Sequence, residues 1–264
     1  MQNKQKSRRN FALTVTETQQ ISPNFQRITL QGDEIAHFGK ESEGGYIKLL
    51  FTPQGGTDIG SLSEEERPLM RTYTIRQFDP ASNQIVVDFV RHITSDLSCG
   101  FAARWAESAQ VGDTISIAGP GKSQSLNQDA DWVFLAADMT AIPALSVTLS
   151  QLNSDARGYA VVELASIADK PELQAPAGIE LIWACSDQGE TLADAVQAQA
   201  WLAGQCSVWC ACEFESMRTL RQYFRNEKEI DREHIYISSY WKNGVSEDGH
   251  KVLKRADADA DTTS

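Results

Sequence analysis

The first part of the chain alternates apolar and polar residues with the period of two that is typical of half-buried β-strands. This alternation and the turn residues between the segments predict strands at residues 11–15, 26–31, 47–51, 70–77, 85–89 and 113–118. Six short antiparallel strands with little helix predict a closed β-barrel over residues 1–125, because closure leaves no exposed strand edge.

After residue 121 the pattern changes to short continuous apolar runs that alternate with segments of helical periodicity. The apolar runs predict strands at residues 132–136, 159–165, 179–184, 207–212 and 234–238. Helices are predicted from about residue 140, at 192–202 and at 214–229. Alternating strands and helices predict a parallel sheet with right-handed crossovers, so residues 126–246 are expected to form a nucleotide-binding α/β domain.

The remaining residues, 247–264, form a polar, acidic tail that ends in an alternation of alanine and aspartate from Ala256 to Asp261. Such a composition predicts a solvated, disordered end. A helical flap over the cleft is the alternative.

Composition narrows the class of protein. A net charge of -12 disfavours nucleic acid as a partner, because phosphate binding requires a clustered basic face. No apolar run approaches the roughly 20 residues needed to cross a bilayer, and the basic N-terminus has no apolar stretch behind it. Five unevenly spaced cysteines are too few for a disulfide framework, so a cytoplasmic location is expected.

The segment Arg71-Thr72-Tyr73-Thr74 on a predicted barrel strand carries a distinctive set of side chains. A flavin needs a flat aromatic neighbour, a hydroxyl or amide beside its ring N5, and a cation near its pyrophosphate. This strand supplies all three on nearby positions, which favours a flavin site. An ordinary strand with an ion pair is the alternative.

A second signal is the helix predicted to begin near Gly100, with Ser98 as the expected N-cap. Backbone N–H groups and the positive end of the helix dipole can hold a diphosphate at such a start. Arg104 adds a positive charge one turn into the helix. A plain amphipathic connector is the alternative.

Two other patterns suggest ligands that their spacing does not support. The segment at residues 119–123 ends like a P-loop, but that motif requires a glycine where Ser116 stands. Cys206, Cys210 and Cys212 match no standard zinc or iron–sulfur spacing, so they are expected to be buried thiols and no metal site is predicted.

Taken in order, the Arg-x-Tyr-Thr strand, the strand at residues 88–92, the short helix and the Gly-Asp turn at 112–113 resemble the flavin domain of the ferredoxin–NADP reductase superfamily. More narrowly, the chain resembles the siderophore-interacting protein family of ferric-siderophore reductases from about residue 11 to 247. The segments that carry this resemblance are residues 46–51, 71–74, 88–92, 103–106, 135–144, 217–221 and 239–244. The most specific of them is Ser239-Tyr240-Trp241-Lys242-Asn243-Gly244.

The resemblance implies noncovalently bound FAD beside an open cleft that admits an anionic ferric siderophore. The residues that it assigns to FAD are Arg71, Thr72, Tyr73, Thr74, Asp88, Val90, His92, Ala102, Ala103, Arg104 and Thr140. The basic residues that it assigns to the siderophore are Lys48, Lys122 and Lys242. On the electron-donor side it places Asp138, Glu213 and Trp241. No side chain is expected to act as a catalytic acid, base or nucleophile.

The resemblance also implies NADH or NADPH as the electron donor, but two departures bear on this expectation. Ala137 and Cys212 stand where the family has glycines at the edge of the second domain. A lost glycine can prevent the close approach of a dinucleotide to the backbone. Reduced ferredoxin therefore remains an alternative donor.

Together these features predict an FAD-dependent reductase that releases Fe(II) from an anionic ferric siderophore in the cytoplasm. Two alternatives stay open. One is a flavin reductase or electron-transfer protein that acts on ferredoxin, flavodoxin or a quinone. The other is a siderophore-binding carrier without redox activity.

Overall fold

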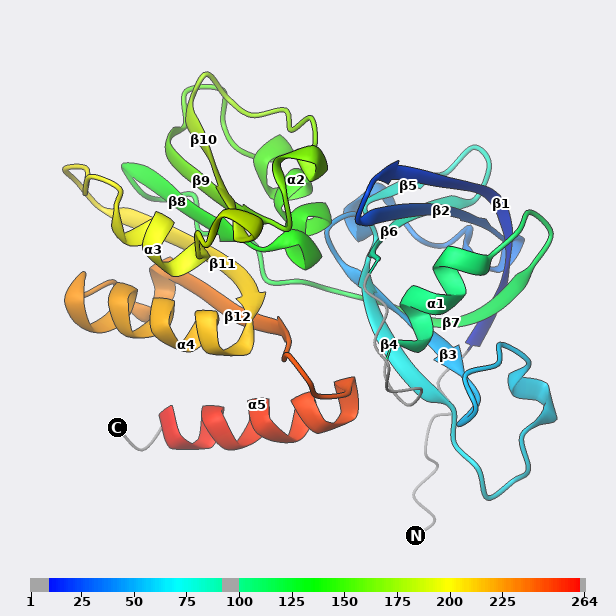
Figure 1. Cartoon of the computed structure of the whole chain (residues 1–264). Helices are drawn as coiled ribbons and strands as arrows, with labels where there is room; N and C mark the ends of the chain where they lie inside the picture. The colour runs from blue at the N-terminus through cyan, green and yellow to red at the C-terminus, as the bar shows by residue number, and fades with distance from the viewer. Residues whose placement is uncertain (1–9, 92–99, 262–264) are drawn as a thin grey trace, which may run out of the picture.

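The computed structural model describes residues 10–91 and 100–261 (Figure 1). His92 and Ser98 lie outside these described residues, so the structure does not test the FAD contact expected of His92. Figure 1 shows two layered units, a strand-rich one that holds the N-terminal half and an α/β one that holds the C-terminal half.

Seven antiparallel strands form the first sheet, in the order β4-β3-β7-β1-β2-β6-β5. Their bounds are β1 Asn10–Ser22, β2 Phe25–Gln31, β3 Tyr46–Phe51, β4 Leu69–Thr74, β5 Gln77–Asp79, β6 Gln84–Val90 and β7 Thr114–Gly121. Inward side chains such as Leu13 and Ile47 form a buried core. The rings of Tyr73 on β4 and Phe89 on β6 have centroids 4.3 Å apart, which brings distant strands together in a barrel-like arrangement.

This barrel has one strand more than the six that the sequence predicts, because the segment at residues 70–77 contributes to two strands. Between β4 and β5, Ile75 exchanges backbone hydrogen bonds of 2.9 Å with Gly44 and Gly45. The chain then turns to pair β5 with β6. A strand of three residues is too short to show an alternating pattern, which is why the sequence does not reveal β5.

Helix α1 (Phe101–Ser108) lies against the barrel, and Phe101, Ala102 and Ala106 belong to the barrel core (Figure 1). The residue in the N-cap position is Gly100 rather than Ser98. Its φ of +68° is a left-handed conformation that glycine adopts without strain, so the turn into the helix depends on glycine.

The second sheet has five parallel strands in the order β10-β9-β8-β11-β12. Its elements are β8 Trp132–Ala137, α2 Ile142–Ser150, β9 Arg157–Leu164, β10 Gly178–Cys185, α3 Leu192–Gln197, β11 Cys206–Glu213, α4 Phe214–Gln222 and β12 Ile235–Trp241. Helix α2 covers one face, while α3 and α4 cover the other (Figure 1). Helix α3 is shorter than the predicted 192–202, and α4 continues as a π-helical turn over Tyr223–Glu227.

The C-terminal segment forms helix α5 (Glu247–Asp261), so the expectation of a disordered tail is wrong and the helical alternative holds. Alanine is the strongest helix former, and polar contacts hold the helix in place. Lys254 Nζ donates to Ser238 Oγ at 2.7 Å, and Arg221 on α4 pairs with Asp257 at 2.7 and 2.8 Å. Figure 1 shows that α5 starts on the barrel side and ends beneath α4. Within residues 10–91 and 100–261, no helix is long and apolar enough to cross a membrane.

Candidate functional site

A cavity of about 670 Å³ lies between the barrel, the carboxyl edge of the parallel sheet and α5. Its volume falls in the range of small-molecule and cofactor sites. The residues singled out from the sequence that line it are Lys48, Arg71, Thr72, Tyr73, Thr74, Asp88, Val90, Ala102, Ala103, Lys122, Thr140, Trp241 and Lys242. Arg104, Asp138 and Glu213 do not line it. Strands β3, β4 and β6, helix α1 and strand β12 thus all contribute to the lining of this cavity.

Two guanidinium groups gather where α1 begins. The Arg71 guanidinium lies 5.6 Å from the centroid of the Phe101 ring, and that of Arg104 lies 5.3 Å from the same ring. The Arg71 side chain is largely buried, and its Nη1 donates to the Met70 carbonyl at 2.8 Å. Positive charge at the N-terminus of a helix suits an anionic group such as a diphosphate.

The Tyr73 ring stands beside these cations and packs on Phe89, with an interplanar angle of 38°. Burial raises the pKa of the Tyr73 hydroxyl well above its ordinary value, and the charge of Glu247 adds to this effect. The phenol therefore stays protonated and can donate a hydrogen bond. A flat ring with a donor at its edge suits the ring system and ribityl chain of a flavin.

On the barrel side of the cavity, Asp88 is a buried carboxylate held by two arginines. Arg27 donates to it through Nε at 2.7 Å and Nη2 at 2.9 Å, and Arg76 Nη1 lies 3.5 Å away. The hydrogen bond to Asp88 is the main cause that raises the pKa of Arg27. Asp88 is therefore neutralised by the barrel itself, and this pairing fixes the strand on which Val90 reaches the cavity.

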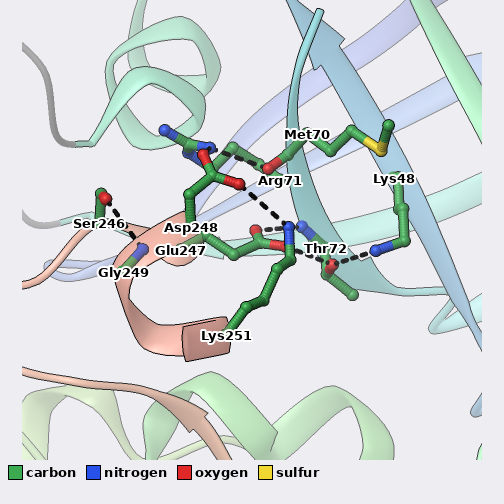
Figure 2. A network of polar contacts seen from close by, with 9 residues as sticks. All are labelled: Lys48, Met70, Arg71, Thr72, Ser246, Glu247, Asp248, Gly249 and Lys251. Atoms are coloured by element: carbon green, nitrogen blue, oxygen red, sulfur yellow. Dashed lines mark hydrogen bonds and ion pairs between the residues drawn. The ribbon is translucent and has the colours of Figure 1, made fainter. Parts of the chain in front are cut away.

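The first turn of α5 docks on β4, as Figure 2 shows. Glu247 accepts the Thr72 backbone N–H and the Thr72 hydroxyl, each at 2.7 Å. Asp248 lies 3.5 Å from Arg71 Nη1, and Lys251 lies 3.1 Å from Glu247. Strand β4 is an edge strand of the first sheet. An edge strand keeps backbone N–H groups available for such a contact.

Sequence reasoning did not assign any α5 residue to the site, although a signal is present. The polar residues that dock the helix, Glu247, His250, Lys254 and Asp257, recur at spacings of three, four and three, which place them on one helical face. His250 is buried and its Nε2 lies 2.8 Å from Ser239 Oγ on β12. Lys251 and Lys254 also line the cavity, and burial lowers the pKa of Lys254.

On the α/β side, the buried Asp138 and the exposed Trp241 form a hydrogen-bonded pair at the carboxyl ends of β8 and β12. Asp138 Oδ2 accepts the Trp241 Nε1–H at 2.7 Å, and Asp138 Oδ1 accepts the Thr140 hydroxyl at 2.6 Å. Burial raises the pKa of Asp138, although these hydrogen bonds oppose that shift. Asp138 thus orients Trp241 and Thr140, which reach the cavity, while its own carboxylate lies behind the wall.

Glu213 is likewise occupied within the protein. Its carboxylate caps α4 by accepting the backbone N–H groups of Glu215 at 2.5 Å and Ser216 at 3.3 Å. It also accepts the Asn243 N–H at 3.1 Å, which ties the loop after β12 to the start of α4. Glu213 therefore shapes the edge of the sheet rather than the cavity surface.

Ala137 and Cys212, which stand where the family has glycines, direct their side chains away from the carboxyl edge of the parallel sheet. Ala137 is fully buried among the residues that pack under α2, and Cys212 is buried among those that pack under α3 and α4. Their side chains fill the cores on the two faces of the sheet. The lost glycines therefore add no atoms at the cavity. Cys206 and Cys210 are also buried free thiols, as expected.

The three lysines predicted from the resemblance lie on the cavity wall, with different surroundings. Lys48 Nζ lies 3.5 Å from Thr72 Oγ1 and 5.9 Å from the Tyr46 ring centroid. Lys242 Nζ lies 2.6 Å from Glu215 Oε1, and this hydrogen bond lowers the pKa of the Glu215 carboxyl. Lys122 lies on the segment that links the two domains.

Comparisons with known proteins agree with this architecture. Residues 14–124 match the model of the siderophore-interacting FAD-binding domain, and residues 130–244 match that of the siderophore-interacting protein. The chain thus combines a flavin-binding barrel with an α/β domain.

Among curated proteins, the chain is 33% identical to ferric vibriobactin reductase ViuB of Vibrio cholerae over 244 residues, which is 87% of this chain and 88% of the relative. It is 29% identical to the NADPH-dependent ferric-chelate reductase of Escherichia coli, over 87% of this chain and 91% of that protein. The crystal structure of SipS from Aeromonas hydrophila superimposes with a TM-score of 0.83 at 30% identity, covering 96% of this chain and 99% of SipS. The chain therefore belongs to the siderophore-interacting protein family, and its barrel is an FAD-binding domain.

Proposed function

We propose that this protein is an FAD-dependent ferric-siderophore reductase of the cytoplasm, which releases iron as Fe(II) from an anionic chelate. The observation that supports this proposal is the joint lining of one cavity by the flavin-type strand and by lysines from both domains. The curated relatives named above are ferric reductases, which agrees with this assignment.

FAD is assigned to the barrel side of the cavity. Arg71 and Arg104, with the start of α1 at Ala102 and Ala103, are suited to the pyrophosphate. Tyr73 and Thr74 are suited to the ring system, with Asp88, Val90 and His92 along it. Bound there, FAD supplies the ability to accept a hydride and to release electrons one at a time.

The electron donor is assigned to the opposite wall, at the carboxyl edge of the parallel sheet. Ligands of open α/β sheets bind at the point where the strand order reverses, here between β8 and β11. Thr140 and Trp241 reach the cavity beside this point. NADH or NADPH is the expected donor, in line with the NADPH-dependent relative, and the inward-facing Ala137 and Cys212 leave room for it.

The chelate is assigned to the basic part of the wall. Hard oxygen ligands hold Fe(III) far more tightly than Fe(II), so the transfer of one electron to the metal weakens the complex. Lys48, Lys122 and Lys242 would each contribute roughly 1 kcal/mol toward an anionic chelate. No side chain needs to transfer a proton to the chelate for this step.

The visible spectrum of the purified protein, followed through a sequence of additions, tests this function. The protein should be yellow, should bleach with NADH or NADPH, and should regain colour when a ferric siderophore is added. If reduced ferredoxin bleaches the protein and neither NADH nor NADPH does, ferredoxin is the electron donor. Equal reoxidation by quinone or flavodoxin would favour a general electron-transfer protein, and colourless protein that binds the chelate would favour a carrier.

A further inference from the structure

The barrel and the α/β domain are joined by a buried carboxylate, that of Asp169, which is 3% exposed. Asp169 follows β9, and its carboxylate accepts hydrogen bonds from Ser22, the last residue of β1, and from Asn24 on the turn before β2. Its Oδ1 accepts the Ser22 hydroxyl at 2.7 Å and the Asn24 backbone N–H at 2.8 Å. Its Oδ2 accepts the Asn24 side-chain amide at 2.8 Å. We call this contact the Asp169 joint.

Hydrogen bonds within each domain support the two sides of the Asp169 joint. On the barrel side, Arg91 donates its backbone N–H to the Asn24 carbonyl at 2.8 Å and its Nη1 to the Pro23 carbonyl at 3.1 Å. On the other side, the Asp169 N–H donates to the Ser166 carbonyl at 3.0 Å. The turn that carries Asn24 and the segment that carries Asp169 are therefore each held by contacts within their own domain.

The Asp169 joint connects directly to both walls of the cavity. Phe25, the residue after Asn24, lines the cavity and packs into the core of the α/β domain. The segment that carries Asp169 begins at Ala165, whose N–H donates to the Met139 sulfur at 3.2 Å. Met139 is the neighbour of Thr140, which lines the opposite wall. A shift at the joint therefore changes the separation of the two walls.

We propose that Asp169 is a positioning residue for the reduction step, because it sets the distance between the FAD wall on the barrel and the donor wall on the sheet. This inference rests on the proposed function. The donor would transfer one hydride, which carries two electrons, to FAD and leave as NAD(P)+; two Fe(III) ions would then take one electron each, and the proton of the hydride would be released to solvent. Hydride transfer requires the reacting atoms to approach within roughly 3.5 Å, and a misplacement of about 1 Å can cost a hundredfold in rate.

A carboxylate is required because three donors converge on two oxygens. An amide at this position would point one N–H group at another donor, and alanine would remove all three bonds. Burial alone would raise the pKa of Asp169, but the hydrogen bonds from Asn24 and Ser22 outweigh it and lower the pKa. The Asp169 carboxylate is therefore ionised at neutral pH and accepts all three hydrogen bonds there.

The test compares Asp169→Ala and Asp169→Asn with the wild type and with Asp155→Ala. Asp155 is an exposed aspartate of the same domain that lies before β9, so its variant controls for the loss of charge. Hydrogen exchange at residues 22–25 should become faster in both Asp169 variants. Stopped-flow reduction by saturating NADPH or NADH should fall about tenfold or more in Asp169→Ala. The dissociation constant for FAD, and the rate at which chemically reduced protein is reoxidised by a ferric chelate, should stay within about twofold.

A double variant on the barrel side, Ser22→Ala with Asn24→Ala, removes the two side-chain donors and keeps only the Asn24 backbone N–H, so it should lower the rate of reduction in the same direction. It also replaces Asp169→Ala if that variant does not fold. Faster hydrogen exchange with unchanged reduction would overturn the positioning role, and so would equal losses in reduction and reoxidation. Wild-type protein that binds FAD but is not reduced by either nucleotide contradicts the proposed donor, whereas reduced wild-type protein that does not reduce the ferric chelate contradicts the proposed function. The interdomain distances of the variants, measured by solution scattering, would then still show whether Asp169 sets the geometry.

Discussion

Glu247 on α5 lies against Thr72 on β4, and its two carboxylate oxygens accept the Thr72 backbone N–H and hydroxyl at 2.7 Å each. The neighbouring Asp248 lies 3.5 Å from the guanidinium of Arg71. Two carboxylates thus stand beside the cation that we propose to hold the FAD pyrophosphate. Because like charges repel, docking of this turn and binding of a diphosphate oppose each other at β4.

This opposition predicts that the double variant Glu247→Gln, Asp248→Asn binds FAD more tightly than the wild type. We expect the dissociation constant to fall by about threefold to tenfold, since two negative charges beside Arg71 are removed. Quenching of flavin fluorescence on binding measures this constant. The matched control, Asp155→Asn with Glu172→Gln, removes the same charge at exposed positions away from the cavity. Equal changes in both double variants would attribute the effect to net charge.

The three lysines of the wall predict a charge-dependent affinity for the substrate. Replacing Lys48, Lys122 and Lys242 together with alanine should raise the KM for an anionic ferric siderophore by about tenfold to a hundredfold. The visible spectrum of bound FAD should not change. A neutral ferric chelate serves as the control, because its KM should barely move. An identical KM for the anionic chelate would show that the lysines do not hold it.

Glu215 allows a sharper version of this experiment. It pairs with Lys242 at 2.6 Å and therefore cancels part of the positive charge of the wall. Glu215→Gln should lower the KM for the anionic chelate, while Lys242→Ala should raise it, so the two single variants should move in opposite directions. Raised salt should reduce both effects. Shifts in the same direction would contradict an electrostatic origin.

The pair of Trp241 and Asp138 predicts a pH-dependent loss of stability. Trp241→Phe removes the donor to a buried carboxylate and should lower the free energy of unfolding by about 1–3 kcal/mol at pH 7. Burial raises the pKa of folded Asp138, so the native state binds a proton more readily than the unfolded state. Stability from this group therefore falls as the pH rises from 3.8 through the folded pKa.

The loss in Trp241→Phe should consequently be smaller near pH 4 than at pH 7, because a protonated Asp138 depends less on the missing donor. Urea unfolding at the two pH values measures this difference. An equal loss at the two pH values would mean that the indole stabilises the fold by packing rather than through the carboxylate.

The arrangement of strands could be predicted from the sequence, whereas the contacts that join distant segments could not. Buried residues such as Leu13 and Ile47 alternate with exposed ones, and this local pattern defines each strand. The partners of Asp169 lie 145 and 147 residues away, so no local pattern marks them. Glu247 and Thr72 are likewise 175 residues apart in the sequence.

Helix α5 illustrates how composition can mislead. Its alanine and aspartate content is typical of disordered ends, but alanine also favours helix, and Asp257 gains a bidentate partner in Arg221. The hydrogen bond from Arg221 is the main cause that lowers the pKa of Asp257. The Arg221–Asp257 pair therefore stabilises the docked helix at pH values above the ordinary carboxyl pKa. This stabilisation is lost as the pH falls through the lowered pKa of Asp257.

Asp257→Asn should accordingly increase hydrogen exchange along residues 247–257 at pH 7, with little change in the exchange of the barrel strands. The difference between the variant and the wild type should vanish once the pH falls below the lowered pKa of Asp257, where this carboxylate gains a proton. Unchanged exchange at pH 7 would show that the contacts of Lys254 and His250 suffice to dock the helix.

The central claim is that the electrons stored by this protein pass to chelated iron, and a single-turnover experiment tests it most directly. Protein loaded with FAD is reduced anaerobically with one equivalent of NADPH and then mixed with excess ferric siderophore and an Fe(II)-specific indicator. We predict about two Fe(II) per FAD, formed at the same rate as the flavin absorbance returns. Flavin that stays reduced in the presence of the ferric siderophore, or absorbance that returns without Fe(II), would contradict the claim.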